Sequence, residues 1–230
     1  MDKHVGVHVL RAFVNKAGQY GNPVGIVLDE KQELNPKVRQ KIATSLSFSE
    51  SVFINDLKER KVSIFNPIKE VRFAGHALLG ASYFINNVLN KSINFLECRA
   101  GRVQTWQENE LTWIRANLEN IPPWHHEELP SGSLVENLSE KQSKCKEHTI
   151  VWAWIDRNKG IAKARTFAPD WGIPEDEANG SGSMQLAAIL KQKLEIHHGK
   201  GSIIYAHCAE TGFADVGGRV KVYPTQRVDI

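Results

Sequence analysis

The chain has 230 residues, of which 41% are hydrophobic and 24% are charged, so it resembles an ordinary folded protein of one large domain or two of about 110 residues. A formal net charge of +3 is too small, and its charges too evenly spread, to indicate a nucleic-acid or anionic-membrane partner. Three distant cysteines without paired spacing argue against a disulfide framework or zinc site, and the sequence lacks a signal-peptide core or membrane span, so we expect a cytoplasmic protein.

The first part of the chain alternates strand-like and helix-like segments. Strands are expected at 4–14 and 24–28, joined by the turn-rich stretch 18–23. Apolar residues at helical spacing predict a helix from Asn35-Pro36 to about Ser45. The hydrophobic pattern further predicts a hairpin of strands 51–54 and 61–65. It also predicts a second helix after Gly75 and three short strands at 93–98, 101–107 and 110–115.

The polar segment 117–148 is the expected boundary between two domains, and we expect it to contain a linker and a helix. We therefore place one domain at 1–116 and another at 117–230, and expect that the last strand can cross back into the first. The later strands are expected at 150–156, 163–167, 202–208, 213–216 and 219–223, with an apolar helix after Gly180. This order lacks the regular alternation of a parallel βαβ fold and indicates an α+β protein.

The two halves share one pattern: a strand, a Phe-x-Pro turn, a polar loop, a glycine with a polar residue, and an apolar helix. In the first half Pro67 precedes Gly75 by eight residues, and in the second Pro169 precedes Gly180 by eleven. A chance match of Phe-x-Pro is common, but the order of all five parts agrees. The sequence therefore suggests a duplicated unit.

Both apolar helices begin with small residues that leave backbone amides accessible. The first N–H groups of a helix lack intrahelical partners and form a positive end that attracts anions. Gly75 and His76 begin one helix, and Gly180, Ser181 and Gly182 begin the other. Two such ends facing one cleft would hold a carboxylate or a developing enolate. The alternative is that the glycine and serine residues form only a helix cap.

Several segments, in this order, resemble the phenazine-biosynthesis (PhzF-type) family of the diaminopimelate-epimerase-like superfamily. The segments are RAFVNKAGQYGNPVGIVL, IATSLSFSESVFI, SIFNPIKEVRFAGHALLGASYFI, FLECRAGRV, ARTFAPDWGIPEDEANGSGS and VGGRVKV. They cover most of residues 5–115 and 150–222. The resemblance implies two similar halves, each a curled β-sheet or barrel around a central helix, with the active site between them.

The resemblance also implies site residues and an activity. The acid/base glutamate of the family matches Glu50 in the stretch Ser49-Glu50-Ser51-Val52-Phe53. Other residues that line or border the family's site match Asn22, Gly75 and His76 in the first half of this chain. In the second half they match Asp176, Gly180 and Ser181. The best-known family activity is a cofactor-free isomerisation that moves a proton between ring carbons, and dimers are common. We therefore expect no cofactor and a homodimer.

The residue types suit such chemistry. An acid/base carboxyl needs a pKa near the working pH, and burial can raise it that far. Glu50 precedes the apolar stretch Val52-Phe53-Ile54, which can bury it. His76, Asp176 and Ser181 would hold substrate or developing charge. The adjacent histidine pairs 125–126 and 197–198 lack partners at ligand spacing, so no metal site is expected.

Departures from the family pattern limit the comparison. Glu177 and Asn179 occupy positions where relatives usually carry Pro and Thr, so we expect the added charge of Glu177 to influence substrate choice. The Arg-Pro-Ser segment of relatives is replaced by 200–202, which favours a more open cleft. Ala74 and Ser181 stand near the places of the two epimerase cysteines, which argues against a two-thiol racemase. A hydrolase using Ser181 lacks the G-x-S-x-G elbow.

The sequence therefore predicts a cofactor-independent isomerase that moves a proton on a small carboxylate-bearing substrate. Glu50, His76 and Asp176 are the candidate catalytic residues. Candidate substrate-binding residues are Asn22, Gly75, His76, Gly180, Ser181 and Gly182. The alternative is a non-catalytic protein that binds a small anion in the same cleft, and the sequence does not identify the substrate.

Overall fold

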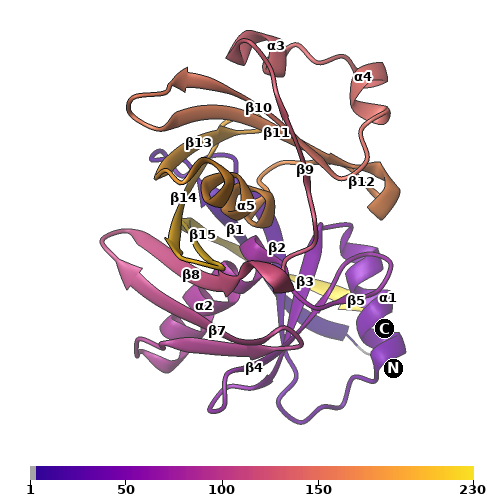
Figure 1. The fold of residues 1–230 in the computed structure, drawn as a ribbon. Coiled ribbons are helices and arrows are strands. Elements are labelled where there is room, and N and C mark those ends of the chain that lie inside the picture. The colour runs from indigo at the N-terminus through magenta and orange to yellow at the C-terminus, as the bar shows by residue number, and fades with distance from the viewer. Residues whose placement is uncertain (1–3) are drawn as a thin grey trace.

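The computed structural model describes residues 4–230, which fold into two stacked halves (Figure 1). The first half contains β1 (His4–Val14), β2 (Asn22–Leu28), α1 (Pro36–Leu46), β3 (Glu50–Asp56), β4 (Lys61–Phe65), β5 (Glu70–Val71), α2 (Gly75–Leu89), β6 (Phe95–Cys98), β7 (Gly101–Glu108), β8 (Leu111–Asn117) and the 3-10 helix η1 (Leu118–Asn120). The second contains β9 (His125–Glu128), α3 (Gly132–Glu136), α4 (Glu140–Lys144), β10 (Thr149–Asp156), β11 (Ile161–Ala168), the 3-10 helix η2 (Pro169–Trp171), β12 (Ile173–Asp176), α5 (Gly180–Leu190), β13 (Leu194–His198), β14 (Ser202–Glu210) and β15 (Phe213–Asp229).

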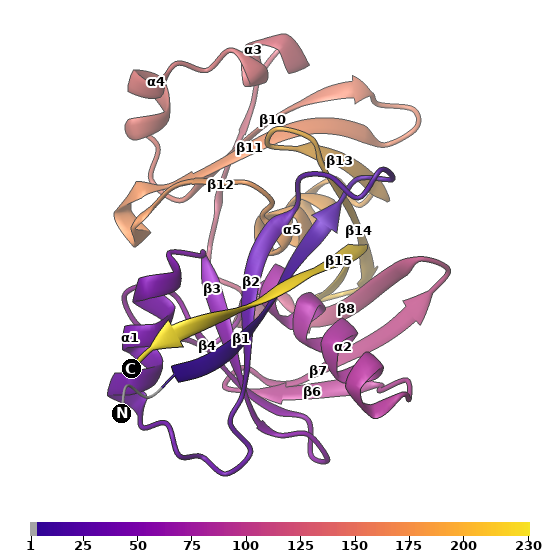
Figure 2. The same ribbon diagram turned by 180° about the vertical axis from the view of Figure 1, so that it is seen from behind.

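The last strand, β15, joins the two halves. Its first part pairs with β8 on one side and β14 on the other, so that Val216 lies opposite both Ile114 and Ala206. Its remaining part runs antiparallel to β1, with Val222 opposite Leu10, as seen from behind in Figure 2. β15 thus crosses into the first half and closes the ring β1-β2-β3-β4-β6-β7-β8-β15.

Strand β3 of the first half buries both faces because α2 covers one of them and α1 the other. Side chains on successive strand residues point to opposite faces. Val52 and Ile54 face the cluster that contains α2, whereas Phe53 between them packs in a second cluster with Ile42 of α1. Helix α2 is apolar nearly all round because the ring of strands encloses it. The enclosing strands therefore fix the position of the first residues of α2, Gly75 and His76.

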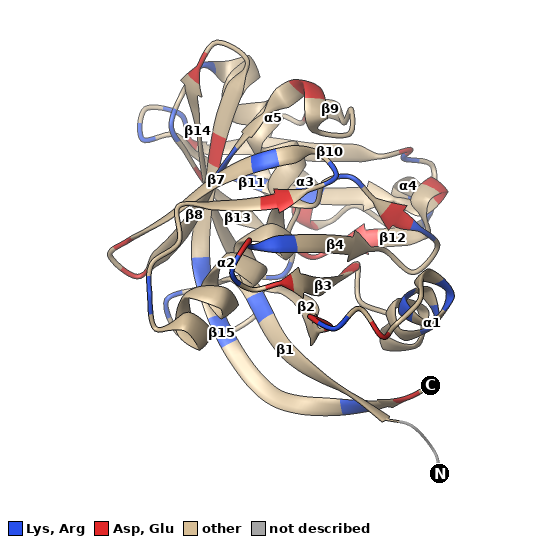
Figure 3. Ribbon diagram, turned by 90° about the horizontal axis from the view of Figure 1, so that it is seen from below, with Lys and Arg blue, Asp and Glu red and all other residues tan. Residues whose placement is uncertain are grey.

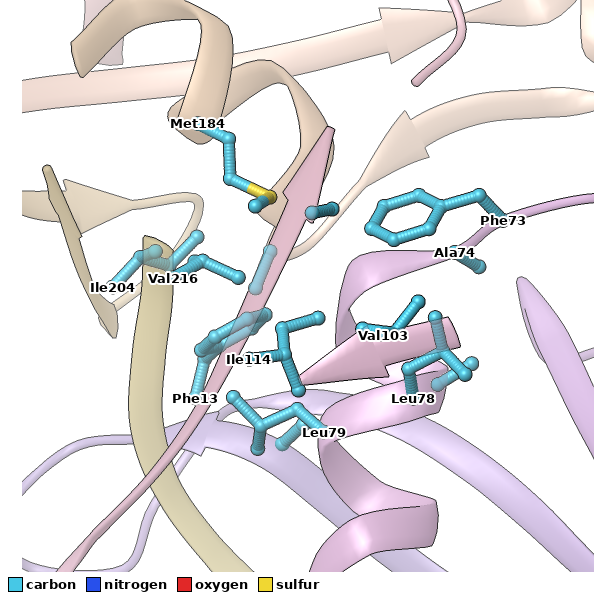
Figure 4. Packing of buried hydrophobic residues seen from close by; sticks show 14 of the residues in the cluster. Phe13, Phe73, Ala74, Leu78, Leu79, Val103, Ile114, Met184, Ile204 and Val216 are labelled. Carbon is cyan, nitrogen blue, oxygen red and sulfur yellow. The ribbon is translucent and has the colours of Figure 1, made fainter. Parts of the chain in front are cut away.

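The second half is a curled sheet with the order β15-β14-β13-β11-β10-β9 around α5. Met184, Leu186 and Ala187 of α5 are buried. Figure 4 shows Met184 near Ile204 and Val216, in the hydrophobic cluster that also contains Leu78 and Leu79 of α2. One core thus runs through both halves and holds the two central helices in a fixed relation.

The duplicated pattern in the sequence corresponds to a repeated arrangement in the structure. In the first half β4 pairs antiparallel with the short β5 before α2 begins, and in the second β11 pairs antiparallel with the short β12 before α5 begins. Each central helix therefore starts after a short strand that folds back on its neighbour. The arrangement agrees with the expectation of two halves, each a curled sheet around a central helix.

Several elements differ from expectation. The segment 117–148 holds two short helices and β9, which pairs parallel with β10, rather than a linker with one helix. Strand β13 was not expected, and the two expected strands 213–216 and 219–223 form one continuous strand. The positions of Lys and Arg and those of Asp and Glu are interspersed along the ribbon in Figure 3. Within residues 4–230, no helix is both long and apolar enough to cross a membrane.

Candidate active site

A cleft of about 680 Å³ lies between the two halves. Its wall includes side chains from the start of β3, the end of β12 and the first turns of α2 and α5. The predicted site residues on this wall are Glu50, Gly75, His76, Asp176, Gly180 and Ser181. The volume lies within the range of about 300–1,000 Å³ typical of small-molecule sites. The fold thus brings together residues that are up to 131 positions apart in the chain, from 50 to 181.

Glu50 is the first residue of β3, and its carboxyl faces the cleft. The side chain is 14% exposed, because the apolar residues that follow it draw the strand into the core. Burial, followed by the nearby Asp176 carboxylate, raises the pKa of Glu50 from 4.5 to about 8. At neutral pH most Glu50 side chains therefore carry a proton. A carboxyl with such a pKa can both donate and accept a proton near pH 7.

His76, the second residue of α2, faces Glu50 directly. Its Nε2 lies 3.4 Å from Oε2 of Glu50, and its side chain is 4% exposed. Burial lowers the pKa of His76 to about 4, although the backbone of Pro23 partly opposes this effect. The contact therefore joins a neutral imidazole to a mostly protonated carboxyl, and it is not an ion pair at neutral pH. Nε2 of His76 is buried and has no hydrogen-bond partner in the structure.

Asp176 ends β12 and is held from three sides. Nδ2 of Asn22 and Nδ2 of Asn179 donate to its two carboxylate oxygens at 2.5 and 2.9 Å, and the backbone N–H of Ala178 donates at 3.3 Å. Burial raises the pKa of Asp176 from 3.8 to about 6, although these hydrogen bonds oppose it. Asp176 is therefore mostly ionised at neutral pH while Glu50 is mostly protonated. Environments that separate two carboxyl pKa values in this way are typical of acid/base sites.

The first turns of the two central helices meet at the cleft. A Cβ added to Gly75 would lie 3.3 Å from the Cα of Gly180 and from the backbone N of Ser181. Glycine is needed here because the two backbones approach so closely. The residue before α2, Ala74, provides no side-chain cap for the first amides of the helix. Two positive helix ends consequently lie side by side at one end of the site.

Ser181 does not have a free hydroxyl. Nε1 of Trp124 donates to its Oγ at 2.9 Å, and Oγ donates to Oδ1 of Asn179 at 3.4 Å. Trp124 comes from the segment between the halves, and its own ring packs edge-on against Trp171. The hydroxyl is thus fixed in place by an aromatic side chain that sequence patterns did not single out.

Three residues considered in the sequence lie outside the cleft wall. Asn22 donates a hydrogen bond to Asp176, and Oδ1 of Asn22 accepts one from Ser49 Oγ at 3.3 Å. The backbone N–H of Gly182 donates to Oδ1 of Asn179 in the cap of α5, so it does not face the cleft. The Glu177 side chain, expected to influence substrate choice, turns away from the cleft towards Ser202.

The cleft wall also contains residues that sequence reasoning missed. They are the cations Lys69, Arg72 and Arg99, which share this wall with Trp124 and Trp171. Arg72 directly precedes Phe73, Ala74 and the first residue of α2, and this proximity to a helix start is the one signal in the sequence that pointed to it. The tryptophans lie in irregular segments, where periodicity carries no information.

Comparisons with known proteins agree with the fold. Residues 10–133 match the family described as phenazine biosynthesis-like protein. A trans-2,3-dihydro-3-hydroxyanthranilate isomerase of Pseudomonas aeruginosa is 26% identical, over 84% of this chain and 82% of that protein. An uncharacterized isomerase of Deinococcus radiodurans is 27% identical, over 87% and 82%.

Solved structures show the same fold. A phenazine biosynthesis protein of the PhzF family from Enterococcus faecalis superposes with a TM-score of 0.80 at 18% identity, covering 99% of this chain and all of that one. A hydroxyproline epimerase from Agrobacterium vitis superposes with a TM-score of 0.63 at 11% identity, covering 100% of this chain and 94% of that one. The chain therefore belongs to the phenazine biosynthesis-like family, and it is an isomerase of that family.

Proposed function

We propose that this isomerase moves a proton between carbon atoms of a small carboxylate-bearing substrate without a cofactor, and that Glu50 is its acid/base. The observation that supports this most directly is the environment of Glu50. Its buried carboxyl faces the cleft with a pKa raised to about 8, 3.4 Å from a neutral His76. A group with this pKa is protonated at rest and still loses its proton readily.

In the proposed reaction Glu50 first donates its proton to one carbon of an unsaturated substrate. The π electrons form the new C–H bond, and positive charge develops on the substrate. The Glu50 carboxylate then removes a proton from another carbon, whose C–H electron pair re-forms the double bond. The substrate and Glu50 thus end with the same number of protons as at the start.

The other residues hold charge during this transfer. Asp176, ionised at neutral pH, stabilises the developing positive charge on the substrate. The first amides of α2 and α5 bind the substrate carboxylate, because a helix N-terminus favours an anion. His76 Nε2 accepts a hydrogen bond from a substrate donor, which would supply the partner it lacks.

Deuterium exchange tests this proposal. The protein is incubated in D₂O with trans-2,3-dihydro-3-hydroxyanthranilate, the compound named for the Pseudomonas relatives, and with a panel of small unsaturated carboxylates. We expect the wild-type protein to incorporate deuterium at carbon in at least one of them, as followed by NMR. Glu50→Gln should lose this activity by a factor of about 10² to 10⁴.

The matched control is Glu59→Gln, which changes an exposed acid on the turn after the same strand. It should exchange at the wild-type rate. Undiminished exchange in Glu50→Gln would contradict the role of Glu50, and tight binding without any exchange by the wild-type protein would favour the anion-binding alternative. The homodimer implied by the family resemblance and the cytoplasmic location expected from the cysteine pattern are further proposals. Light scattering on the purified protein tests the first.

A further inference from the structure

The Glu177 carboxylate belongs to a hydrogen-bonded cluster behind the cleft. Ser202 Oγ donates to its Oε1 at 2.9 Å, and the backbone N–H of Lys200 donates to the same oxygen at 3.2 Å. The side chain therefore points from the loop before α5 towards the start of β14.

Ser202 carries the connection into the first half of the protein. Its side chain is fully buried, and its Oγ accepts a hydrogen bond from the backbone N–H of Gly21 at 2.9 Å. A serine hydroxyl has one proton, and donating it to Glu177 leaves the oxygen lone pairs for Gly21. Gly21 has a φ of +79°, and an added Cβ would lie 2.8 Å from the carbonyl oxygen of Ala12. The turn at Gly21 therefore leaves no space for a side chain at this position.

The next residue returns to the active site. Asn22 Nδ2 donates to Oδ1 of Asp176 at 2.5 Å and to the carbonyl oxygen of Ala178 at 3.1 Å. Asp176 and Ala178 flank Glu177 in the chain. Hydrogen bonds thus connect Glu177 to Ser202 and Ser202 to Gly21, and the next residue, Asn22, is hydrogen-bonded to the two residues that flank Glu177.

The backbone of Glu177 is held as firmly as its side chain. Nδ1 of His198 donates to the Glu177 carbonyl oxygen at 2.8 Å, and Nε2 of His198 lies 2.9 Å from Oγ1 of Thr166. His198 is fully buried, and burial lowers its pKa to about 4. It is therefore neutral at physiological pH, with one nitrogen for each partner. Thr166 in turn lies opposite Asp176 in the pairing of β11 with β12.

We propose that Glu177 is a positioning residue, which acts through Ser202 and Gly21 to hold Asn22 against Asp176 across the boundary between the two halves. We call the contacts among Glu177, Ser202 and Gly21 the Glu177 bridge. The Glu177 bridge joins a loop of the second half to a turn of the first without touching the cleft. It orients the carboxylate that faces the site.

The charge of Glu177 has a separate effect on its neighbour. Burial raises the pKa of Asp176 most, and the Glu177 carboxylate, on the next residue of the chain, adds the smallest contribution. Charged groups around Glu177 itself are Lys200, whose charge favours ionised Glu177, and Glu175, whose charge opposes it. Asp176 is also near Glu50, whose pKa it raises. Removing the Glu177 charge should therefore lower the pKa of Asp176.

Amide hydrogen exchange of Gly21 tests the positioning role without any substrate. Ser202→Ala removes the acceptor of the Gly21 N–H, and we expect this amide to exchange about tenfold faster, as for the loss of one buried hydrogen bond. Glu177→Ala should also accelerate it, because Ser202 loses its orienting partner. Glu177→Gln keeps an acceptor oxygen and should retain slow exchange. Amides of β10 serve as an internal reference for the fold.

Titration of the Asp176 carboxyl by carbon-detected NMR tests the effect of charge. In Glu177→Gln the apparent pKa of Asp176 should fall, whereas in Glu128→Gln, which removes an exposed acid from β9, it should not change. A Gly21 amide that exchanges at the wild-type rate in Ser202→Ala would overturn the bridge. An unchanged Asp176 titration in Glu177→Gln would overturn the electrostatic part.

One consequence rests on the proposed function. If ionised Asp176 supports proton transfer, Glu177→Gln should extend the activity to lower pH. Failure of this activity measurement alone, with both NMR results as expected, would contradict the role of Asp176 in catalysis and leave the Glu177 bridge intact.

Discussion

At the scale of single residues, the site depends on three buried groups with different protonation states. Burial acts on all three, but it raises the pKa of the two carboxyls and lowers that of the imidazole, because it disfavours the charged form in each case. Hydrogen bonds from Asn22, Asn179 and Ala178 keep the pKa of Asp176 below that of Glu50. At neutral pH the cleft therefore contains one protonated carboxyl, one carboxylate and one neutral imidazole.

This arrangement gives a definite pH dependence. The reaction starts from protonated Glu50 and ionised Asp176. Its kcat/KM should fall as the pH rises through about 8, where Glu50 loses its proton, and as the pH falls through about 6, where Asp176 gains one. Steady-state rates across this range, with the substrate identified by deuterium exchange, measure both limbs. A rate that increases as the pH rises through about 8 would show that Glu50 acts first as a base.

At the scale of elements, the close contact of α2 and α5 sets the position of the anion-binding amides. Gly75→Ala would place a methyl group 3.3 Å from the backbone of Gly180 and Ser181, which is tighter than an ordinary contact. We expect the helix starts to separate and kcat/KM to fall by about 10- to 100-fold, since small displacements in a site are costly. The melting temperature should change little by comparison.

Gly6→Ala provides the control for this substitution. It adds the same methyl group to β1, where the nearest atom is the Thr225 methyl carbon at 3.9 Å. This variant should keep wild-type activity. Equal losses of activity in the two variants would show that the helix contact has no special role.

Helices and strands with a regular hydrophobic pattern could be predicted from sequence. The spacing of Val38, Ile42 and Leu46 predicts α1, and Phe-x-Pro before each glycine predicts the start of both central helices. Strand β9 could not be predicted, because its sequence, His125–Glu128, is polar and it forms only by pairing with β10. Local sequence carries no signal for such a contact.

The candidate site likewise includes residues that the sequence predicts and residues that it could not predict. Glu50, His76 and Asp176 lie in motifs of the family, and the structure brings them to one cleft. Trp124 could not be predicted, since its role depends on a hydrogen bond to Ser181, 57 residues away. The direction of the Glu177 side chain was also inaccessible, because it depends on Ser202, 25 residues further along the chain.

At the scale of the whole molecule, the two halves act as one unit. β15 pairs with strands of both, and a single hydrophobic cluster contains α2 and α5. Burial raises the pKa of Glu50 most, and the charge of Asp176, which belongs to the second half, raises it further. Neither half alone would create the same acid/base group.

A direct titration of Glu50 tests this central claim. Carboxyl carbons are labelled in glutamate, and the Glu50 resonance is identified by its absence in Glu50→Gln. We expect it to titrate with an apparent pKa of about 8 in the wild-type protein. A value near the ordinary 4.5 would show that Glu50 is ionised at neutral pH and would contradict its role as the resting acid of the reaction.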